Sequence, residues 1–178
     1  MIIRLTQRLA AKIKESPAVA LHREFDPFAD WTANLFTAER TQYILFTNSA
    51  SLYSVVFAGR GITRSDLFVE RAVDTLREVM VESGYGAIFE KRIEPLTSDI
   101  VFSKTGDRRV MGSMNDHVHC ARVHFEYGDQ PSAVAARLNK TPMGFLAYRF
   151  PKEVLAELGG LEKGPSKGGK LIPFPVRK

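Results

Sequence analysis

The chain has 178 residues, of which 44% are hydrophobic and 25% are charged; this predicts one globular domain large enough for a hydrophobic core. No apolar run approaches the roughly 20 residues that a membrane-spanning helix needs, and charges interrupt the N-terminal segment where a signal peptide would be apolar, so we expect no membrane association. The single cysteine, Cys120, excludes an internal disulfide, and these features together predict a cytoplasmic protein.

Positive charge is concentrated at the C-terminal end. The net charge is +5, but residues 160–178 hold five basic residues and one acidic residue, so the rest of the chain is nearly neutral. We therefore predict one domain over residues 1–159 and a basic Gly/Pro/Lys-rich tail over 160–178 that is mobile and dispensable for folding. An alternative is that residues 171–178, which contain "LIPFPV", dock on a protein partner or on the domain itself.

Hydrophobic periodicity and turn residues divide the chain into elements. A first strand ending in Thr6 precedes a helix that Pro17 ends, and residues 16–30 follow as a loop. Residues 31–57 predict a three-stranded antiparallel meander. Beyond it the pattern predicts helices over 64–83, about 109–126, 131–139 and 151–160, with strands over 99–104 and 143–150, while 85–97 fits either a short helix or a strand.

These elements predict an α+β fold, because the two long amphipathic helices each need an apolar partner and the sheet is the obvious one. We expect a single antiparallel sheet of four to six strands with helices mainly on one face. The alternative is a mixed sheet in which strand 99–104 pairs parallel to the first strand.

Four segments also resemble an uncharacterised bacterial family, which is known as a domain of unknown function. They are "MIIRLTQRL", "WTANLF" with its W-x-A-N-L motif, "YILFTNSASLYSVVF" and "KTGDRRVMGSMND", which carries R-x-V-x-G-S-M-N-D. The resemblance covers about residues 1–120, in the same order. Members are small single-domain proteins without an established activity, so the resemblance implies a segmentation and no chemistry.

The stretch "VFSKTGDRRVMGSMND" (residues 101–116) is the strongest functional candidate, because a short strand leads into a helix start with three cations nearby. A helix N-terminus favours anions through its free N–H groups and its dipole. We therefore predict an anion site that uses six residues: Lys104, Thr105, Arg108, Arg109, Ser113 and Asn115. In one interpretation the helix starts at Ser113, which forms a capping box with Asp116; in the other it starts near Arg108.

Catalysis on a phosphate would need an acid and a base in addition to the cations of this stretch. His119, His117 and Asp116 are the candidate catalytic residues for a small phosphodiesterase or ribonuclease-like enzyme that would use the 104–119 region. His117, Cys120 and His124 share one face of the predicted helix, but no second cluster supplies further ligands, so we expect no metal site. We also expect no cofactor.

The predicted sheet offers a second, weaker candidate. Trp31 and Asn34 lie in one strand, and an aromatic and an amide on a sheet face can stack on and hydrogen-bond a base. The competing interpretation places Trp31 in the core. Taken together, the sequence favours a binding or regulatory protein for a phosphate-bearing partner, with nucleic acid or a nucleotide as the expected ligand. The enzyme remains the alternative, and the sequence names no reaction.

Overall fold

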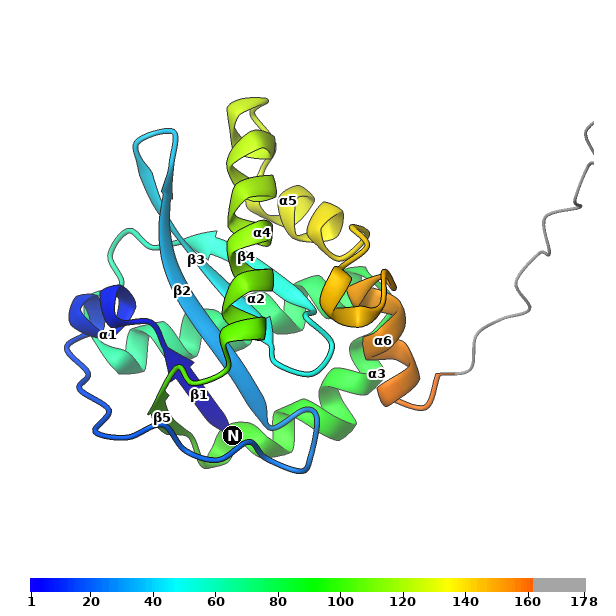
Figure 1. Ribbon diagram of the computed structural model, residues 1–178, viewed down its shortest axis with the longest axis horizontal. Coiled ribbons are helices and arrows are strands. Elements are labelled where there is room, and N and C mark those ends of the chain that lie inside the picture. The colour runs from blue at the N-terminus through cyan, green and yellow to red at the C-terminus, as the bar shows by residue number, and fades with distance from the viewer. Residues whose placement is uncertain (162–178) are drawn as a thin grey trace, which may run out of the picture.

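The computed structural model describes residues 1–161, which form a five-stranded sheet with helices on both faces (Figure 1). The strands are β1 (Ile2–Leu5), β2 (Asp30–Ala38), β3 (Thr41–Asn48), β4 (Ser54–Ala58) and β5 (Val101–Lys104). The α-helices are α1 (Gln7–Ile13), α2 (Ser65–Glu82), α3 (Gly86–Ile88), α4 (Arg108–Glu126), α5 (Pro131–Leu138) and α6 (Pro151–Leu158). Shorter turns complete the chain: π-helical η1 (Phe89–Ile93) and the 3-10 turns η2 (Glu94–Ser98) and η3 (Gly144–Leu146).

The strand order is β4-β3-β2-β1-β5. The meander β2–β3–β4 is antiparallel, whereas β1 pairs parallel with β2 on one side and with β5 on the other. A two-residue turn joins β2 to β3, with Glu39 and Arg40 both at positive φ, the conformation that a tight type I′ hairpin requires. The chain's first strand therefore lies inside the sheet and not at its edge.

Side-chain alternation along the strands sends apolar residues to both faces. One face carries Trp31 and Phe46, and α1, α2 and the turn after α3 pack against it. The other face carries Phe36 and Leu45, and α4 and α5 cover it. The apolar part of this second face lies on β2, β3 and β4; towards β1 the same face becomes polar, and that change places the pocket described below.

The α+β class and the single sheet are confirmed, and the mixed alternative is the observed arrangement. Two expectations differ from the structure. The long helices α2 and α4 lie on opposite faces, whereas the sequence predicted helices mainly on one face. The strand predicted over 143–150 is instead a tight loop around η3, closed by a single bridge between Met143 and Arg149.

The predicted basic tail falls almost wholly outside the described residues, so its predicted mobility and its predicted docking segment, 171–178, stay predictions. Within residues 1–161, no helix is long and apolar enough to cross a membrane.

Candidate functional site

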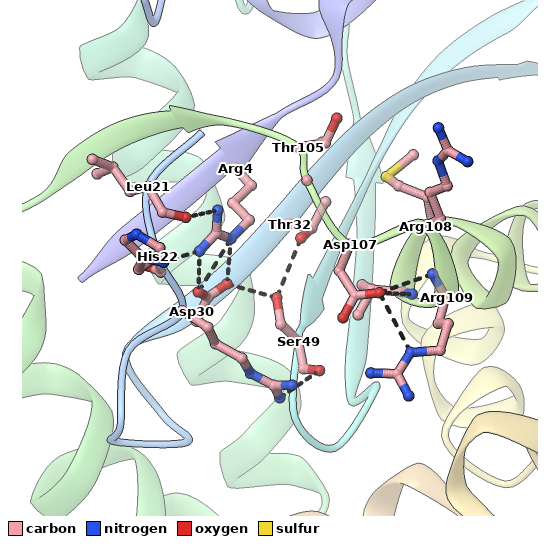
Figure 2. A pocket seen from close by; sticks show the side chains of 14 residues that line it. Arg4, Leu21, His22, Asp30, Thr32, Ser49, Thr105, Asp107, Arg108 and Arg109 are labelled. Atoms are coloured by element: carbon pink, nitrogen blue, oxygen red, sulfur yellow. Dashed lines mark hydrogen bonds and ion pairs between the residues drawn. The ribbon is translucent and has the colours of Figure 1, made fainter. Parts of the chain in front are cut away.

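A polar pocket of about 530 Å³ opens beside the start of α4 (Figure 2). It lies over the polar part of the sheet, between the loop that follows α1 and the turn that joins β5 to α4. Its lining is formed by Arg4, Leu21, His22, Arg23, Asp30, Thr32, Ser49 and residues 105–111. Its volume is within the range of small-ligand pockets.

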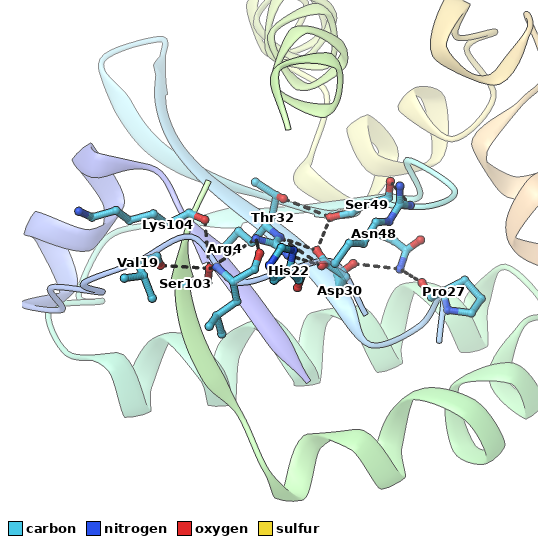
Figure 3. Close-up of polar contacts among 12 residues, drawn as sticks. Arg4, Val19, His22, Pro27, Asp30, Thr32, Asn48, Ser49, Ser103 and Lys104 are labelled. Carbon is cyan, nitrogen blue, oxygen red and sulfur yellow. Dashed lines mark hydrogen bonds and ion pairs between the residues drawn. The ribbon is translucent and has the colours of Figure 1, made fainter. Parts of the chain in front are cut away.

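The floor of the pocket is a buried ion pair between β1 and β2 (Figure 3). Arg4 and Asp30 are 6% and 1% exposed. The Arg4 Nε donates to both carboxylate oxygens of Asp30, at 2.9 and 3.1 Å, and Nη2 donates to Oδ2 at 2.7 Å. A buried charge is tolerated only when it is paired and hydrogen-bonded, as this pair is.

The same guanidinium fixes the loop that forms one wall. Arg4 Nη1 donates to the carbonyl of Leu21 at 2.8 Å, and Nη2 donates to the carbonyl of His22 at 3.1 Å. The backbone N–H of Leu21 donates to Ser103 Oγ on β5 at 2.9 Å. An arginine has five N–H donors, and all three nitrogens of the Arg4 guanidinium already donate to protein acceptors. Arg4 therefore has little hydrogen-bonding capacity left for a ligand.

Ser49 links this floor to an exposed cation. Its hydroxyl donates to Asp30 Oδ1 at 2.8 Å, and its carbonyl accepts from Arg23 Nη2 at 2.9 Å. Arg23 is thereby held at the mouth of the pocket although its side chain is exposed.

The opposite wall is the first turn of α4, which begins at Arg108. Asp107 is the N-cap: its Oδ1 accepts from the backbone N–H groups of Arg109 at 2.8 Å and Val110 at 3.4 Å. The interpretation that starts the helix near Arg108 is therefore correct, and the capping box of Ser113 with Asp116 is wrong. Ser113 lies inside the helix, where its hydroxyl donates to the carbonyl of Arg109 at 3.1 Å.

This cap also corrects the predicted chemistry. The sequence predicted that free backbone N–H groups at the helix start would hold an anion, but the Asp107 carboxylate occupies two of them. What remains for an anion is the set of guanidinium groups. Arg108 and Arg109 are exposed; the Arg109 Nε lies 3.8 Å from Asp107 Oδ1, and its guanidinium lies 5.7 Å from the ring centre of Phe145.

The pocket is basic overall. Four arginines and two aspartates line it, which leaves a formal charge of +2. Arg4 and Asp30 cancel each other, so the free positive charge belongs to Arg23, Arg108 and Arg109. We call these three the rim arginines.

The structure brings together three of the six predicted anion-binding residues: Thr105, Arg108 and Arg109 line the pocket. Lys104 lines a neighbouring hollow of about 660 Å³ instead, which it shares with Thr105. Ser113 is buried against the protein interior, and Asn115 is exposed on α4 outside the pocket lining. Half of the predicted set thus lines one pocket, while Lys104, Ser113 and Asn115 lie outside it, and the anion site itself stays a prediction.

The predicted catalytic residues do not meet at this pocket: His117, His119 and Asp116 are all absent from its lining. His117 is 1% exposed, and its Nδ1 lies 3.0 Å from Ser54 Oγ. Burial lowers its pKa to about 4, so the ring is neutral at pH 7. His119 and Asp116 are exposed, and two residues along a helix turn by about 200°, so His117 and His119 cannot face one substrate.

The three residues considered as metal ligands, His117, Cys120 and His124, also have different surroundings in the structure. His124 lies 3.3 Å from Asp129, while His117 contacts Ser54. Burial and the charge of Asp116 raise the pKa of the Cys120 thiol. Among residues 1–161, no three His, Cys, Asp or Glu side chains come close enough to hold a metal ion.

The predicted base-stacking role of Trp31 is wrong, because the side chain has no exposed surface. It stacks on Phe46 with ring centres 4.8 Å apart, and its Nε1 donates to the carbonyl of Phe28 at 2.8 Å. Strand alternation puts Asn34 on the opposite face from Trp31, where it is half-buried. The two side chains therefore cannot contact one base together.

Sequence reasoning missed the residues that build the pocket floor and its second wall: Arg4, Asp30, Ser49 and Arg23. A usable signal was present. Arg4 interrupts the apolar "MIIRLT", and Asp30 opens the apolar β2 segment. Opposite charges on two interior strands predict a buried pair, since neither charge is stable there alone.

Comparison with curated proteins and with solved structures gives no match. A family model does match, over residues 2–154, and its description is a domain of unknown function, DUF6933. The match spans the whole sheet and the pocket, and it extends past the segments whose motifs suggested the resemblance. The chain belongs to the DUF6933 family.

Proposed function

We propose that the protein binds nucleic acid, with the rim arginines holding backbone phosphates at the mouth of the pocket. One observation carries the proposal: three arginines from two segments that are distant in the sequence line the same pocket. Within residues 1–161, no carboxylate lies within 4.0 Å of Arg23 or Arg108, and Arg109 has one at 3.8 Å. Guanidinium groups match phosphate geometry, and water-exposed arginines remain free to bind it.

Binding is favoured over catalysis for a specific reason. The carboxylates of the pocket are already engaged, Asp30 with Arg4 and Asp107 with the start of α4. The histidines of the 104–119 region lie elsewhere. General acid–base chemistry needs free titratable groups within reach of the reacting atom. Among the residues that the structure describes, His22 is the one histidine of the pocket lining, and the lining holds no second free acid or base to work with it. We therefore do not extend the proposal to the predicted phosphodiesterase.

The test is a binding titration of the full-length chain with a labelled RNA oligonucleotide over a range of salt concentrations. Arg108→Gln with Arg109→Gln should weaken binding and lower the salt slope by about one to two, since each phosphate contact contributes nearly one. Arg23→Gln should act in the same direction from the other wall. Thermal stability should stay unchanged, because exposed charges contribute little to it.

The matched control is Arg71→Gln with Lys91→Gln, which removes the same charge from exposed positions on the elements that cover the opposite face. The basic tail stays intact in every variant, so its attraction for RNA cancels in the comparison. Asp107→Asn tests the opposite change. The asparagine keeps a capping oxygen but removes a negative charge beside Arg109, so this variant should bind RNA more tightly. Equal binding by the wild type and both double variants would rule the proposal out.

A further inference from the structure

Two exposed aromatic side chains lie a few residues along the chain from groups at the rim of the pocket, although neither belongs to its lining. Phe25 is 104% exposed and Tyr148 is 78% exposed. Phe25 follows Arg23 by two residues on the wall that the Arg4 guanidinium fixes. Tyr148 lies in the loop around η3, whose Phe145 packs beneath the guanidinium of Arg109. On each wall, an exposed aromatic residue thus lies within three residues of a rim arginine or of the ring that packs beneath one.

Backbone hydrogen bonds fix the loop that carries Tyr148. Met143 and Tyr148 are tied together: the N–H of Met143 donates to the carbonyl of Arg149 at 3.1 Å, and the N–H of Tyr148 donates to the carbonyl of Met143 at 2.9 Å. Ala147 and Tyr148 both have left-handed backbone angles, with φ of 53° and 62°. This conformation is costly for residues with a Cβ.

The chain next to Phe25 is anchored as well. Asp26 Oδ1 accepts from the N–H of Phe28 at 2.9 Å and lies 3.8 Å from Arg92 Nη2. The carbonyl of Pro27 accepts from Asn48 Nδ2 at 2.8 Å. The residue that follows Phe25 is thus tied to the body of the domain, while the Phe25 ring itself contacts almost nothing.

Arginines interleaved with displayed aromatic rings are the chemistry that single-stranded nucleic acid requires. Guanidinium groups hold the phosphates, and aromatic faces stack on bases. In a duplex the base faces are already stacked inside the helix, so they are not offered to Phe or Tyr. We infer that the pocket belongs to a surface for single-stranded nucleic acid, with Phe25 and Tyr148 stacking on unpaired bases at its two sides. This inference rests on the proposed function and adds the class of nucleic acid to it.

The experiment titrates the full-length protein with oligouridylate, with oligodeoxythymidylate and with a duplex of the same length, each about 12 nucleotides, which is within the usual site size. The wild type should bind the single strands more tightly than the duplex. Phe25→Ala and Tyr148→Ala should each weaken single-strand binding by about tenfold or more. Duplex binding should change by less than twofold, because only phosphates are contacted there. The two single strands report whether the sugar matters.

Two controls separate stacking from structure. Tyr127 is 81% exposed at the far end of α4, so Tyr127→Ala removes an equally displayed ring away from the pocket and should leave binding unchanged. Tyr148→Phe keeps the ring and should bind as the wild type does. An oligonucleotide with 2-aminopurine gives a direct signal, since stacking on Tyr148 quenches its fluorescence and Tyr148→Ala should restore it.

The outcomes distinguish the two proposals. If the arginine variants lose affinity but both aromatic-to-alanine variants bind single strands as the wild type does, nucleic-acid binding stands and base stacking is overturned. The same conclusion follows if the duplex binds at least as tightly as the single strands. If the arginine variants and the aromatic variants all bind like the wild type, both proposals fail together.

Discussion

The buried pair of Arg4 and Asp30 shows how two residues whose hydrogen-bonding groups are already engaged can hold the walls of a pocket together. Its hydrogen bonds join two strands of the sheet to the loop that carries Arg23. A buried pair often adds little net stability compared with apolar residues of the same size. Its value here is positional, because the guanidinium holds the carbonyls of Leu21 and His22 over the sheet and so adds to the hydrogen bonds that Leu21 and Arg23 make with Ser103 and Ser49.

Arg4→Met should therefore be severely destabilising, since it leaves the Asp30 carboxylate buried without its partner. We expect a loss of about 3–5 kcal/mol in the free energy of unfolding, measured by urea denaturation. Arg4→Met combined with Asp30→Leu should recover part of that loss, because no uncompensated charge remains. A single variant as stable as the wild type would show that the pair does not support the fold.

His117 is a buried histidine whose hydrogen-bond partners favour one tautomer of the ring. Ser54 Oγ lies 2.9 Å from the carbonyl of Leu52 and 2.8 Å from Thr47 Oγ1 as well as 3.0 Å from His117 Nδ1. Its one proton goes to the carbonyl, so the network is satisfied when Nδ1–H of His117 donates to Ser54. Nε2, which is buried without a partner among the described residues, is then a bare acceptor and not a stranded donor.

Acid should weaken the fold through this residue. The folded-state pKa of His117 is lowered to about 4, below the unfolded value of about 6.5, so the unfolded chain takes up the proton first. The stabilisation is fully present above pH 6.5 and is lost as the pH falls towards 4, by roughly 3 kcal/mol in all. Unfolding curves from pH 7 to pH 4 should be flatter for His117→Gln than for the wild type. Parallel pH profiles would contradict the assignment.

At the scale of the element, α4 shows why a capping motif is easily misplaced. Ser113 and Asp116 have the spacing of a capping box, but Asp107 also precedes a helical run and follows the end of strand β5 by three residues. Val110 and Met114 belong to the apolar stripe that packs on the sheet, so starting the helix at Asp107 buries one more turn of it. Both Asp107 and Ser113 are acceptable caps by local sequence, and the packing of the apolar stripe of α4 on the sheet favours Asp107.

The two candidate caps make opposite predictions for mutagenesis. Asp107→Ala should lower the free energy of unfolding by about 1 kcal/mol, because two N–H groups at the helix start lose their acceptor. Ser113→Ala should change it by less than about 0.5 kcal/mol, since alanine favours a helix interior and the serine only bonds its own preceding turn. Thermal or urea unfolding measures both. The reverse ranking would restore the capping box.

Strand β4 has its exposed edge closed by a side chain. Asn139, at the end of α5, accepts from the N–H of Ser54 at 2.8 Å and donates to the carbonyl of Ser54 at 2.8 Å. The amide thus copies the pairing of a sixth strand at one residue. All the atoms involved are buried.

Asn139→Ala should cost about 2–3 kcal/mol of unfolding free energy, because both backbone groups of Ser54 are left buried and unpaired. Asn139→Asp is the sharper comparison: it keeps the acceptor and loses the donor, so it should be destabilising even though its size is the same. Urea denaturation of the two variants checks this. Stability equal to that of the wild type would mean that water replaces the amide.

At the scale of the whole molecule, periodicity predicted most of the elements but not their arrangement. Alternation identified the meander, and apolar stripes identified α2 and α4. Nothing local says which face of a sheet a helix covers, so the division of α2 and α4 between the two faces could not be derived. The region 143–150 misled because its apolar residues alternate as in a strand, while Ala147 and Tyr148 turn left-handed.

The residues of the pocket also divide into those that the sequence could predict and those that only the fold brings together. Thr105, Arg108 and Arg109 were predictable because they are neighbours in the sequence. Arg23 was not, because only the tertiary fold brings it to residues 105–111. Asp30 carried a signal as the buried partner of Arg4, but nothing in the sequence placed that pair beside residues 105–111. Ser113 and Asn115 were included wrongly because sequence proximity does not specify the direction of a side chain on a helix. A pocket assembled from five segments exceeds what local spacing can reveal.

The interior position of β1 has a consequence for the protein during translation. Its pairing with β2 closes over a short span, and the Arg4–Asp30 contact joins residues only 26 apart, so this half can form while the nascent chain is still emerging. The other edge of β1 must wait for β5, and the hydrogen bond between Leu21 and Ser103 spans 82 residues. Until then the ribosome holds a chain with an open parallel edge, which chaperones or neighbouring chains can engage. The late-arriving strand therefore completes the sheet and the pocket wall in the same step.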